Sequence, residues 1–230
     1  MADAVKRKRT YSSPRRDQQA AETRRSILDA AQRRFERDGF PATTMDAIAS
    51  EAAVSLKTVY LAFETKGRLL RAVWDLALKG DESDAPVEAR PWYVEVLEER
   101  DPARKLRLLA TNACIVKQRI GGLLRVIRDA APSDPDGRAL WELIQSDFYA
   151  NQRVIVESLD RNHDLAPHLD VSRATDLLWT LNHPDLWLLL VGQRGWTPQE
   201  FEAWLGDTAC AQLLPGTARR SARPSASRRS

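Results

Sequence analysis

The sequence predicts an all-α protein with two parts, a small N-terminal helix-turn-helix head and a larger helical bundle. Apolar residues recur at helical spacing along most of the chain, and few segments alternate strictly between apolar and polar residues. The 10 glycines and 12 prolines lie mostly between these periodic segments, as expected for helices joined by short loops. A chain of 230 residues is also long enough to bury a substantial core.

The composition is that of a soluble globular protein, with 43% hydrophobic and 29% charged residues. The two cysteines, Cys114 and Cys210, are far apart, which argues against a disulfide framework but leaves a single long-range bridge open. The N-terminus is charged, and the apolar run 185–191 is too short to span a bilayer. We therefore expect a cytoplasmic protein with no membrane partner.

Both ends of the chain are strongly basic. Residues 1–16 carry six basic groups against Asp3, and residues 219–230 carry five arginines and no acid, so each end has a net charge of +5. Because the whole chain carries +3, the remaining residues carry −7. We predict a disordered basic arm over residues 1–20 and a disordered basic tail over residues 215–230. Basic arms commonly support nucleic-acid contact, although the tail is equally consistent with a solubilising role.

The predicted head, residues 21–66, begins with a helix over residues 23–37. Its inner face is formed by Ile27, Leu28, Ala31 and Phe35. We expect the helix to end at Gly39 in a left-handed conformation, with Phe40 folded back onto the last turn.

Two short helices follow, and their starts are marked by capping residues. Thr43 and Thr44 precede the first, and Ser55 precedes the second, which runs to about Phe63 with Val59 turned inward. Only a few residues separate the two helices. This arrangement is typical of a helix-turn-helix, in which the second of the pair lies in the DNA major groove.

The opposite face of this reading helix carries Lys57, Thr58 and Tyr60, and Lys66 begins the next helix, predicted over residues 66–79. Taken singly, Tyr60 is also consistent with a partly buried aromatic and Lys66 with a solvated charge. Their occurrence together after a capped turn favours phosphate contact, because neutralising phosphates supplies most non-specific DNA affinity.

From about Thr23 to Leu70 the sequence resembles the TetR family of one-component regulators. The resemblance rests on the first-helix apolar face, the turn at 38–40, Thr43-Thr44 before Ile48-Ala49, Val54-Ser55 before Thr58-Val59-Tyr60, and Phe63, Lys66, Leu69 and Leu70. It implies a homodimer on a palindromic operator and a larger C-terminal domain that binds a small effector. By position, Thr44, Tyr60 and Lys66 match phosphate-contacting residues, and Leu56, Lys57 and Thr58 match the base-facing start of the reading helix.

The full set of DNA-binding candidates is Thr43, Thr44, Ser55, Leu56, Lys57, Thr58, Tyr60 and Lys66. The chain departs from the family at Ala53, which stands where the turn usually has glycine. If that position requires a positive φ, alanine costs about 1 kcal/mol there.

The predicted regulatory domain, residues 67–214, contains several further helices. We expect them over residues 92–99, 101–118, 123–131, 134–161 and 171–191, the last broken at Pro184, and over 197–213 behind a Thr197–Glu200 capping box. Gly121 and Gly122 are expected to loosen the chain between two of them. A cavity for a small apolar or aromatic effector requires aromatic residues with a few polar groups, and the candidates are Trp92, Tyr93, Asn112, Trp141, Phe148, Tyr149 and Trp179.

The two C-terminal helical segments are apolar almost all round, which favours a dimer interface made as a four-helix bundle by two subunits. The interface candidates are Leu178, Leu181, Leu186, Leu189, Phe201, Trp204 and Leu205. The alternative for these residues is the core of a single subunit.

An enzyme is disfavoured by the absence of a recognisable reactive site. His163, His168 and His183 are scattered, neither cysteine joins them at metal-ligand spacing, and no glycine-rich phosphate loop or nucleophile motif is present. We therefore expect no metal and no cofactor. The predicted function is a sequence-specific transcriptional regulator, acting as a repressor released by its effector. The alternative is an activator or architectural DNA-binding protein without an effector.

Overall fold

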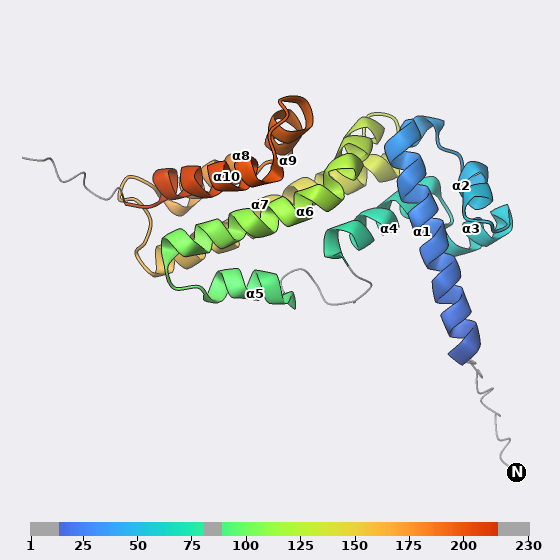
Figure 1. Cartoon of the computed structure of the whole chain (residues 1–230), viewed down its shortest axis with the longest axis horizontal. Coiled ribbons are helices and arrows are strands. Elements are labelled where there is room, and N and C mark those ends of the chain that lie inside the picture. Colours follow the sequence, from blue (N-terminus) through green and yellow to red (C-terminus); the bar gives the residue numbers. More distant parts are fainter. Residues whose placement is uncertain (1–13, 81–88, 216–230) are drawn as a thin grey trace, which may run out of the picture. The chain divides into compact units, whose positions relative to one another are not determined.

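The computed structural model describes residues 14–80 and 89–215, and these residues form helices without any strand (Figure 1). The chain divides into two units. The first comprises residues up to Ala77 together with Gly122–Trp141, and the second comprises Leu78–Gly121 together with the residues from Glu142 onward. Residues 1–13, 81–88 and 216–230 lie outside the described part, and with them most of the predicted arm and tail.

Four helices begin the chain: α1 (Pro14–Ala42), α2 (Met45–Glu51), α3 (Leu56–Phe63) and α4 (Lys66–Lys79). Helix α2 packs against both α1 and α3. The core of this first unit is made by the inner faces that the periodicity predicted, including Ile27, Ala31, Phe35, Ile48, Val59, Phe63, Leu69 and Leu70. Because most of α4 and residues 122–141 belong to it, the unit extends beyond the predicted head, residues 21–66.

Helix α1 begins at Pro14, so the prediction that residues 14–20 belong to a disordered arm is wrong. Proline is preset for the first helical position, Asp17 in the first turn interacts favourably with the positive end of the helix, and the glutamines and alanines that follow are good helix formers. The predicted stop is confirmed. Gly39 has φ +79° and interrupts the helix, and the Phe40 ring stacks on Phe35 with centroids 5.8 Å apart.

The second unit contains α5 (Pro91–Glu98), the first part of α6 (Pro102–Ala130), most of α7 (Pro135–Arg161), α8 (Val171–Leu181), α9 (Pro184–Trp187), the π-helix η2 (Leu188–Gln193) and α10 (Pro198–Leu213). The helix starts agree with the sequence: Asp170 caps α8, and Thr197 and Glu200 form the predicted capping box of α10. Pro184 separates α8 from α9, as predicted. Among the described residues, no helix has the length and hydropathy needed to cross a bilayer.

Helix α6 runs through Gly121 and Gly122 without interruption, so the predicted break at these residues is wrong. Both glycines are places of close packing. A Cβ atom on Gly121 would lie 3.3 Å from the indole nitrogen of Trp187, and one on Gly122 would lie 3.1 Å from the carboxyl carbon of Glu36. The missing side chain makes room for a neighbour here and does not end the helix.

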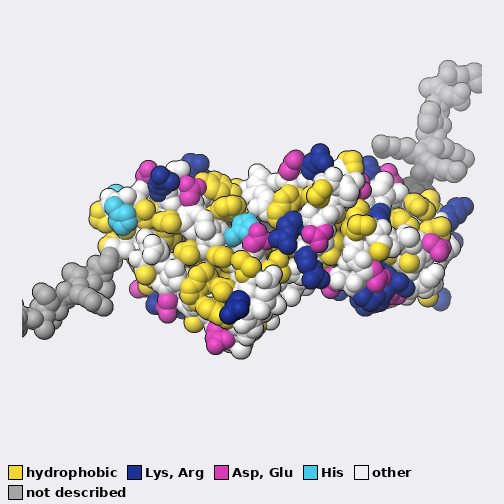
Figure 2. Space-filling model, turned by 90° about the horizontal axis from the view of Figure 1, so that it is seen from above, with side chains coloured by type: hydrophobic (Ala, Val, Ile, Leu, Met, Phe, Trp, Pro, Cys, Tyr) yellow, Lys and Arg dark blue, Asp and Glu magenta, His cyan; other side chains and the backbone are white. Residues whose placement is uncertain are grey.

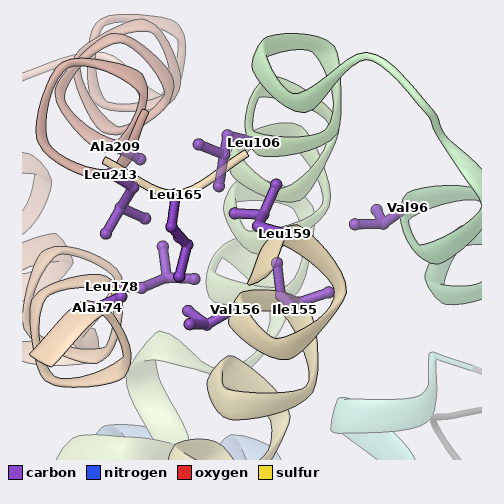
Figure 3. Close-up of a cluster of buried hydrophobic side chains, with 10 residues drawn as sticks. All are labelled: Val96, Leu106, Ile155, Val156, Leu159, Leu165, Ala174, Leu178, Ala209 and Leu213. Carbon is purple, nitrogen blue, oxygen red and sulfur yellow. The ribbon is translucent and has the colours of Figure 1, made fainter. Parts of the chain in front are cut away.

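The main core of the second unit is formed by side chains from five helices and by Leu165, which lies in the turn between α7 and α8 (Figure 3). They point toward one another and comprise Val96, Leu106, Ile155, Val156, Leu159, Leu165, Ala174, Leu178, Ala209 and Leu213. A second cluster contains Ala110, Cys114, Trp187, Phe201 and Leu205. Both cysteines are free.

These two clusters bury three of the predicted dimer-interface residues inside a single subunit. Leu178 and Phe201 are 0% exposed and Leu205 is 1% exposed. Their apolar side chains are covered by α6, α7 and the other C-terminal helices of the same chain, so the core alternative applies to them. The other four predicted residues remain interface candidates, because Leu181, Leu186 and Trp204 are half-buried and Leu189 is exposed.

Candidate nucleic-acid interface

The α2–turn–α3 segment is held in place by capping hydroxyls at the start of each helix. Thr44 Oγ1 accepts a hydrogen bond from the Ala47 amide at 3.1 Å, and Ser55 Oγ accepts one from the Thr58 amide at the same distance. Such caps satisfy backbone donors that a short helix otherwise leaves free. The hydroxyl of Ser55 also lies 2.7 Å from that of Thr58. Thr44 and Ser55 therefore cap the helix starts that they were predicted to mark, and Thr58 lies within the first turn of α3 beside Ser55.

The turn between α2 and α3 requires a left-handed residue, and the chain places an alanine there. Ala53 has φ +55°, and its neighbour Val54 donates a 3.0 Å hydrogen bond to Ala49 that closes the turn. The turn therefore has the positive φ that makes alanine unfavourable at this position. A residue with a Cβ atom is strained in this conformation by about 1 kcal/mol.

Helix α3 buries one face and exposes the other. Val59 is 0% exposed and Phe63 is 4% exposed, whereas Tyr60 is 48% exposed and Leu61 is 77% exposed. Lys57 is exposed and Leu56 lies beside it at 37%. The predicted readers thus share an accessible surface, on a helix whose opposite side is anchored in the core.

Two predicted contact residues instead point into the unit. Thr43 is 1% exposed, and its hydroxyl donates to the carbonyl oxygens of Gly39 at 2.7 Å and Arg34 at 3.2 Å. The ammonium of Lys66 donates to the carbonyl oxygens of Phe40 at 2.7 Å and Thr43 at 2.9 Å. Burial lowers the pKa of Lys66, with Asp134 acting in the opposite direction. These contacts give both residues a positioning role within the head.

Ion pairs join the second half of α1 to the end of α2. Glu51 accepts from the guanidinium groups of Arg33 at 2.9 Å and Arg34 at 2.5 Å, and the hydrogen bond from Arg33 is the main cause that lowers the pKa of Glu51. Ser26 Oγ donates to the carbonyl oxygen of Ala52 at 3.2 Å, which satisfies a group at the end of α2. Helix α3 is thus supported by a head tied together at several points. Lys and Arg side chains gather over this unit on the face seen in Figure 2.

A groove of about 440 Å³ runs between α1 and α3, and most of its lining residues were not among the predicted DNA contacts. It is lined by Arg16, Gln19, Ala20, Thr23, Arg24, Ile27, Thr58, Leu61 and Ala62. The Arg24 guanidinium lies 4.5 Å from the centroid of the Phe63 ring, where it stacks α1 against the end of α3. Leu61 could have been predicted as an exposed contact residue, because it is apolar but does not lie on the buried face formed by Val59 and Phe63.

The predicted effector residues fall into separate groups. Asn112 Nδ2 donates to the Trp92 carbonyl oxygen at 3.0 Å, and the Trp92 and Tyr93 rings meet edge to face at 5.9 Å. Phe148 and Trp179 pack against His183, with the Trp179 and His183 rings 4.8 Å apart, and Tyr149 packs against Trp179. Trp141 belongs to the first unit.

A surface depression of about 630 Å³ in the second unit involves none of the predicted effector residues. It is lined by Pro91, Val94, Glu95, Glu98, Glu99, Arg100 and Arg104. The described residues contain no group of three or more His, Cys, Asp or Glu side chains arranged to hold a metal ion.

Comparison with known proteins agrees with this geometry. Residues 27–73 match the family model of the bacterial regulatory proteins of the tetR family. Over 60 residues the chain is 38% identical to the HTH-type transcriptional regulator AcrR of Shigella flexneri, a match that covers 26% of this chain and 28% of that protein. The similarity to this curated relative is therefore confined to about a quarter of each protein.

Solved structures share the fold over most of the chain. The SmeT–triclosan complex matches with a TM-score of 0.65 at 17% identity, covering 85% of this chain and 93% of SmeT. A transcriptional regulator from Saccharomonospora viridis in complex with choline also matches with a TM-score of 0.65, at 19% identity, covering 84% and 98% of the two chains. With the head geometry, the family model and the shared fold in agreement, the chain has the N-terminal domain of the TetR family of bacterial regulatory proteins.

Proposed function

We propose that this protein is a transcriptional repressor that reads double-stranded DNA with the exposed face of α3. The observation that carries the proposal is the two-sided character of this helix. Val59 and Phe63 anchor it in the core, while Lys57, Tyr60 and Leu61 remain accessible on a capped helix inside the segment that matches the TetR-family model. A helix presented in this way fits the major groove of B-DNA.

The exposed residues divide by chemistry into base readers and phosphate contacts. Lys57 supplies a donor for guanine O6 and N7, and Leu56 and Leu61 supply apolar contacts for thymine methyl groups. The hydroxyls of Thr44 and Tyr60 supply donors for the phosphate backbone, which set the register of the helix in the groove. Thr43 and Lys66 act through the fold, because their polar atoms are bonded to backbone carbonyls.

We further propose that the protein acts as a homodimer through the C-terminal helical segments. Leu189 is 46% exposed, and the half-buried Leu181, Leu186 and Trp204 lie on neighbouring segments of the chain. A second copy that covers these side chains would remove apolar surface from water. Two identical heads would then address the two halves of a palindromic operator.

A small-molecule effector in the second unit would release the protein from DNA. The triclosan complex of SmeT and the choline complex of the Saccharomonospora viridis regulator support this part of the proposal, since both chains share the fold. A second candidate function is an activator or architectural DNA-binding protein without an effector. It is favoured by the packing of Phe148 and Trp179 against His183, because these two predicted ligand contacts are engaged with a side chain of the same chain.

Selection of bound duplexes from a random DNA pool, with purified full-length protein in 150 mM salt, tests the proposal. Enrichment of an inverted repeat is expected, and sedimentation of the selected complex should give two chains per duplex. Lys57→Ala should change the preferred bases, whereas Tyr60→Phe should weaken binding to all sequences alike. Salt-sensitive binding without any enriched motif would favour the architectural function.

A further inference from the structure

Lys117 on α6 is a buried lysine that has no acidic partner among the described residues. Its side chain is 4% exposed, and its ammonium donates to the neutral amide oxygen of Asn182. Among the described residues no carboxylate pairs with it. Burial therefore lowers the pKa of Lys117 to about 7. A buried charge is normally paired, because an isolated ion in the protein interior is costly.

Lys105, twelve residues earlier on α6, shows how the same side chain is accommodated when more of its donors have acceptors. It is 2% exposed and donates to Ser158 Oγ at 2.9 Å and to the Leu97 carbonyl oxygen at 3.2 Å. Asp164 and Glu99 also favour its charged form, although burial remains the main effect on its pKa and lowers it. The two lysines thus differ in what surrounds the ammonium, and Lys105 is a natural control for Lys117.

The amide groups beside Lys117 are held by hydrogen bonds in an orientation that offers its ammonium a single acceptor oxygen. Asn182 Nδ2 donates to Gln152 Oε1 at 3.2 Å, and Gln152 Nε2 is directed to the Phe148 carbonyl oxygen at 3.4 Å. This chain of amides turns the single oxygen of Asn182 toward the ammonium. An ammonium group has three donors, and one amide oxygen satisfies one of them.

Two further buried donors lie around the same end of α8 and also lack an acceptor. They are Gln145 Nε2 and Trp179 Nε1. Both residues are tied to His183, the neighbour of Asn182: Gln145 Oε1 lies 3.3 Å from its Nε2 atom, and the Trp179 ring lies 4.8 Å from its ring. Unsatisfied buried donors of this kind require an explanation, and a bound acceptor is one.

The other side of Lys117 is apolar. Its ammonium is 5.7 Å from the centroid of the Phe201 ring, and Cys114 precedes it by one helical turn. Phe201 in turn packs edge to face on Trp187 at 5.1 Å. The cation therefore lies at the boundary between an amide cluster and an aromatic cluster, which suits a ligand with an anionic head and an apolar body.

We propose that Lys117 anchors the carboxylate of a hydrophobic organic acid, whose apolar body packs against the Phe201 and Trp187 side of the second unit. This inference rests on the proposed effector function and names the chemical class of the effector. The carboxylate supplies the acceptor oxygens and the negative charge that Asn182 lacks. Ordered water could satisfy the donors, but it supplies no negative charge, so only an anionic ligand would restore the charged form of the buried amine.

The test is calorimetry of the full-length protein without DNA at pH 8. The probes are benzoate, 1-naphthoate and decanoate, each paired with its primary amide. At least one acid should bind 10-fold or more tightly than its amide. Repeating the titration in two buffers of different ionisation enthalpy should show an uptake of about one proton, because Lys117 is mostly neutral at this pH and becomes charged in the complex.

Lys117→Met should lose both the acid preference and the proton uptake, and Lys105→Met should keep both. The acid–amide comparison on the unaltered protein needs no variant, so it decides the matter even if a variant fails to fold. Absence of binding by all three acids, equal binding of acids and amides, or unchanged binding by Lys117→Met would overturn the proposal. Since no DNA is present, these outcomes are independent of whether an operator is selected.

Discussion

The ammonium nitrogen of Lys66 lies 2.7 Å from the carbonyl oxygen of Phe40 and 4.2 Å from the centroid of the Phe40 ring. A third contact, to the Thr43 carbonyl oxygen at 2.9 Å, completes the arrangement. The last carbonyls of a helix lack partners within it. Lys66, at the start of α4, donates to carbonyl groups at and just beyond the end of α1 and so joins the two helices within the first unit.

We expect Lys66→Met to lower the free energy of unfolding by about 1–3 kcal/mol, because the two carbonyl oxygens lose a charged donor at a partly buried site. Urea denaturation followed by circular dichroism measures this. Lys57→Met is the control, since an exposed lysine on α3 should change stability by no more than about 0.5 kcal/mol. Unchanged stability in Lys66→Met, together with a uniform loss of DNA affinity, would return Lys66 to the phosphate contacts.

Ala53→Gly should stabilise the protein. The substitution removes the strain of a Cβ atom at φ +55°, about 1 kcal/mol, and after the greater chain entropy of glycine is subtracted we expect a net gain of about 0.5 kcal/mol. Ala139→Gly, at an exposed position within α7 in the same unit, should instead cost about 1 kcal/mol. Thermal and urea unfolding of both variants would show opposite signs, and a loss of stability in both would contradict the strain at Ala53.

The stability difference between the unaltered protein and Lys117→Met should depend on pH. The folded-state pKa of Lys117, about 7, is below its ordinary value of 10.5, so the unfolded chain binds more protons between these values. Stability relative to the variant should therefore rise with pH over this window, by up to about 1.4 kcal/mol per pH unit. Urea titrations at pH 7, 8 and 9 measure it. A constant difference would show that Lys117 titrates normally.

Removal of residues 1–13 should reduce the salt dependence of operator binding with little change in sequence preference. This segment carries Lys6, Arg7, Lys8 and Arg9, and its removal leaves α1 intact from Pro14. Each phosphate contact that is lost should lower the slope of log K against log salt by about 0.9. Fluorescence anisotropy at several salt concentrations measures the slope, and an unchanged slope would exclude the arm from DNA contact.

The sequence by itself determined the local structure of the head and most helix boundaries. Gly39, Thr44, Ser55, Pro184 and the Thr197–Glu200 box act within one or two turns of themselves, so their effects could be predicted from neighbouring residues. The alternation of buried Val59 and Phe63 with exposed Tyr60 on α3 follows from helical periodicity alone.

Only the tertiary structure decided what distant residues do. By residue type and position Lys66 looks like a phosphate contact, but the carbonyl oxygen of Phe40, 26 residues earlier, accepts a hydrogen bond from its ammonium. As a glycine next to a second glycine, Gly121 looks like a helix break, but the Trp187 side chain occupies the space beside it. Lys117 looks like any lysine on an amphipathic helix until Asn182 and Phe201 close over it. In each case the partner comes from another part of the chain, and periodicity carries no information about which residues meet across a core.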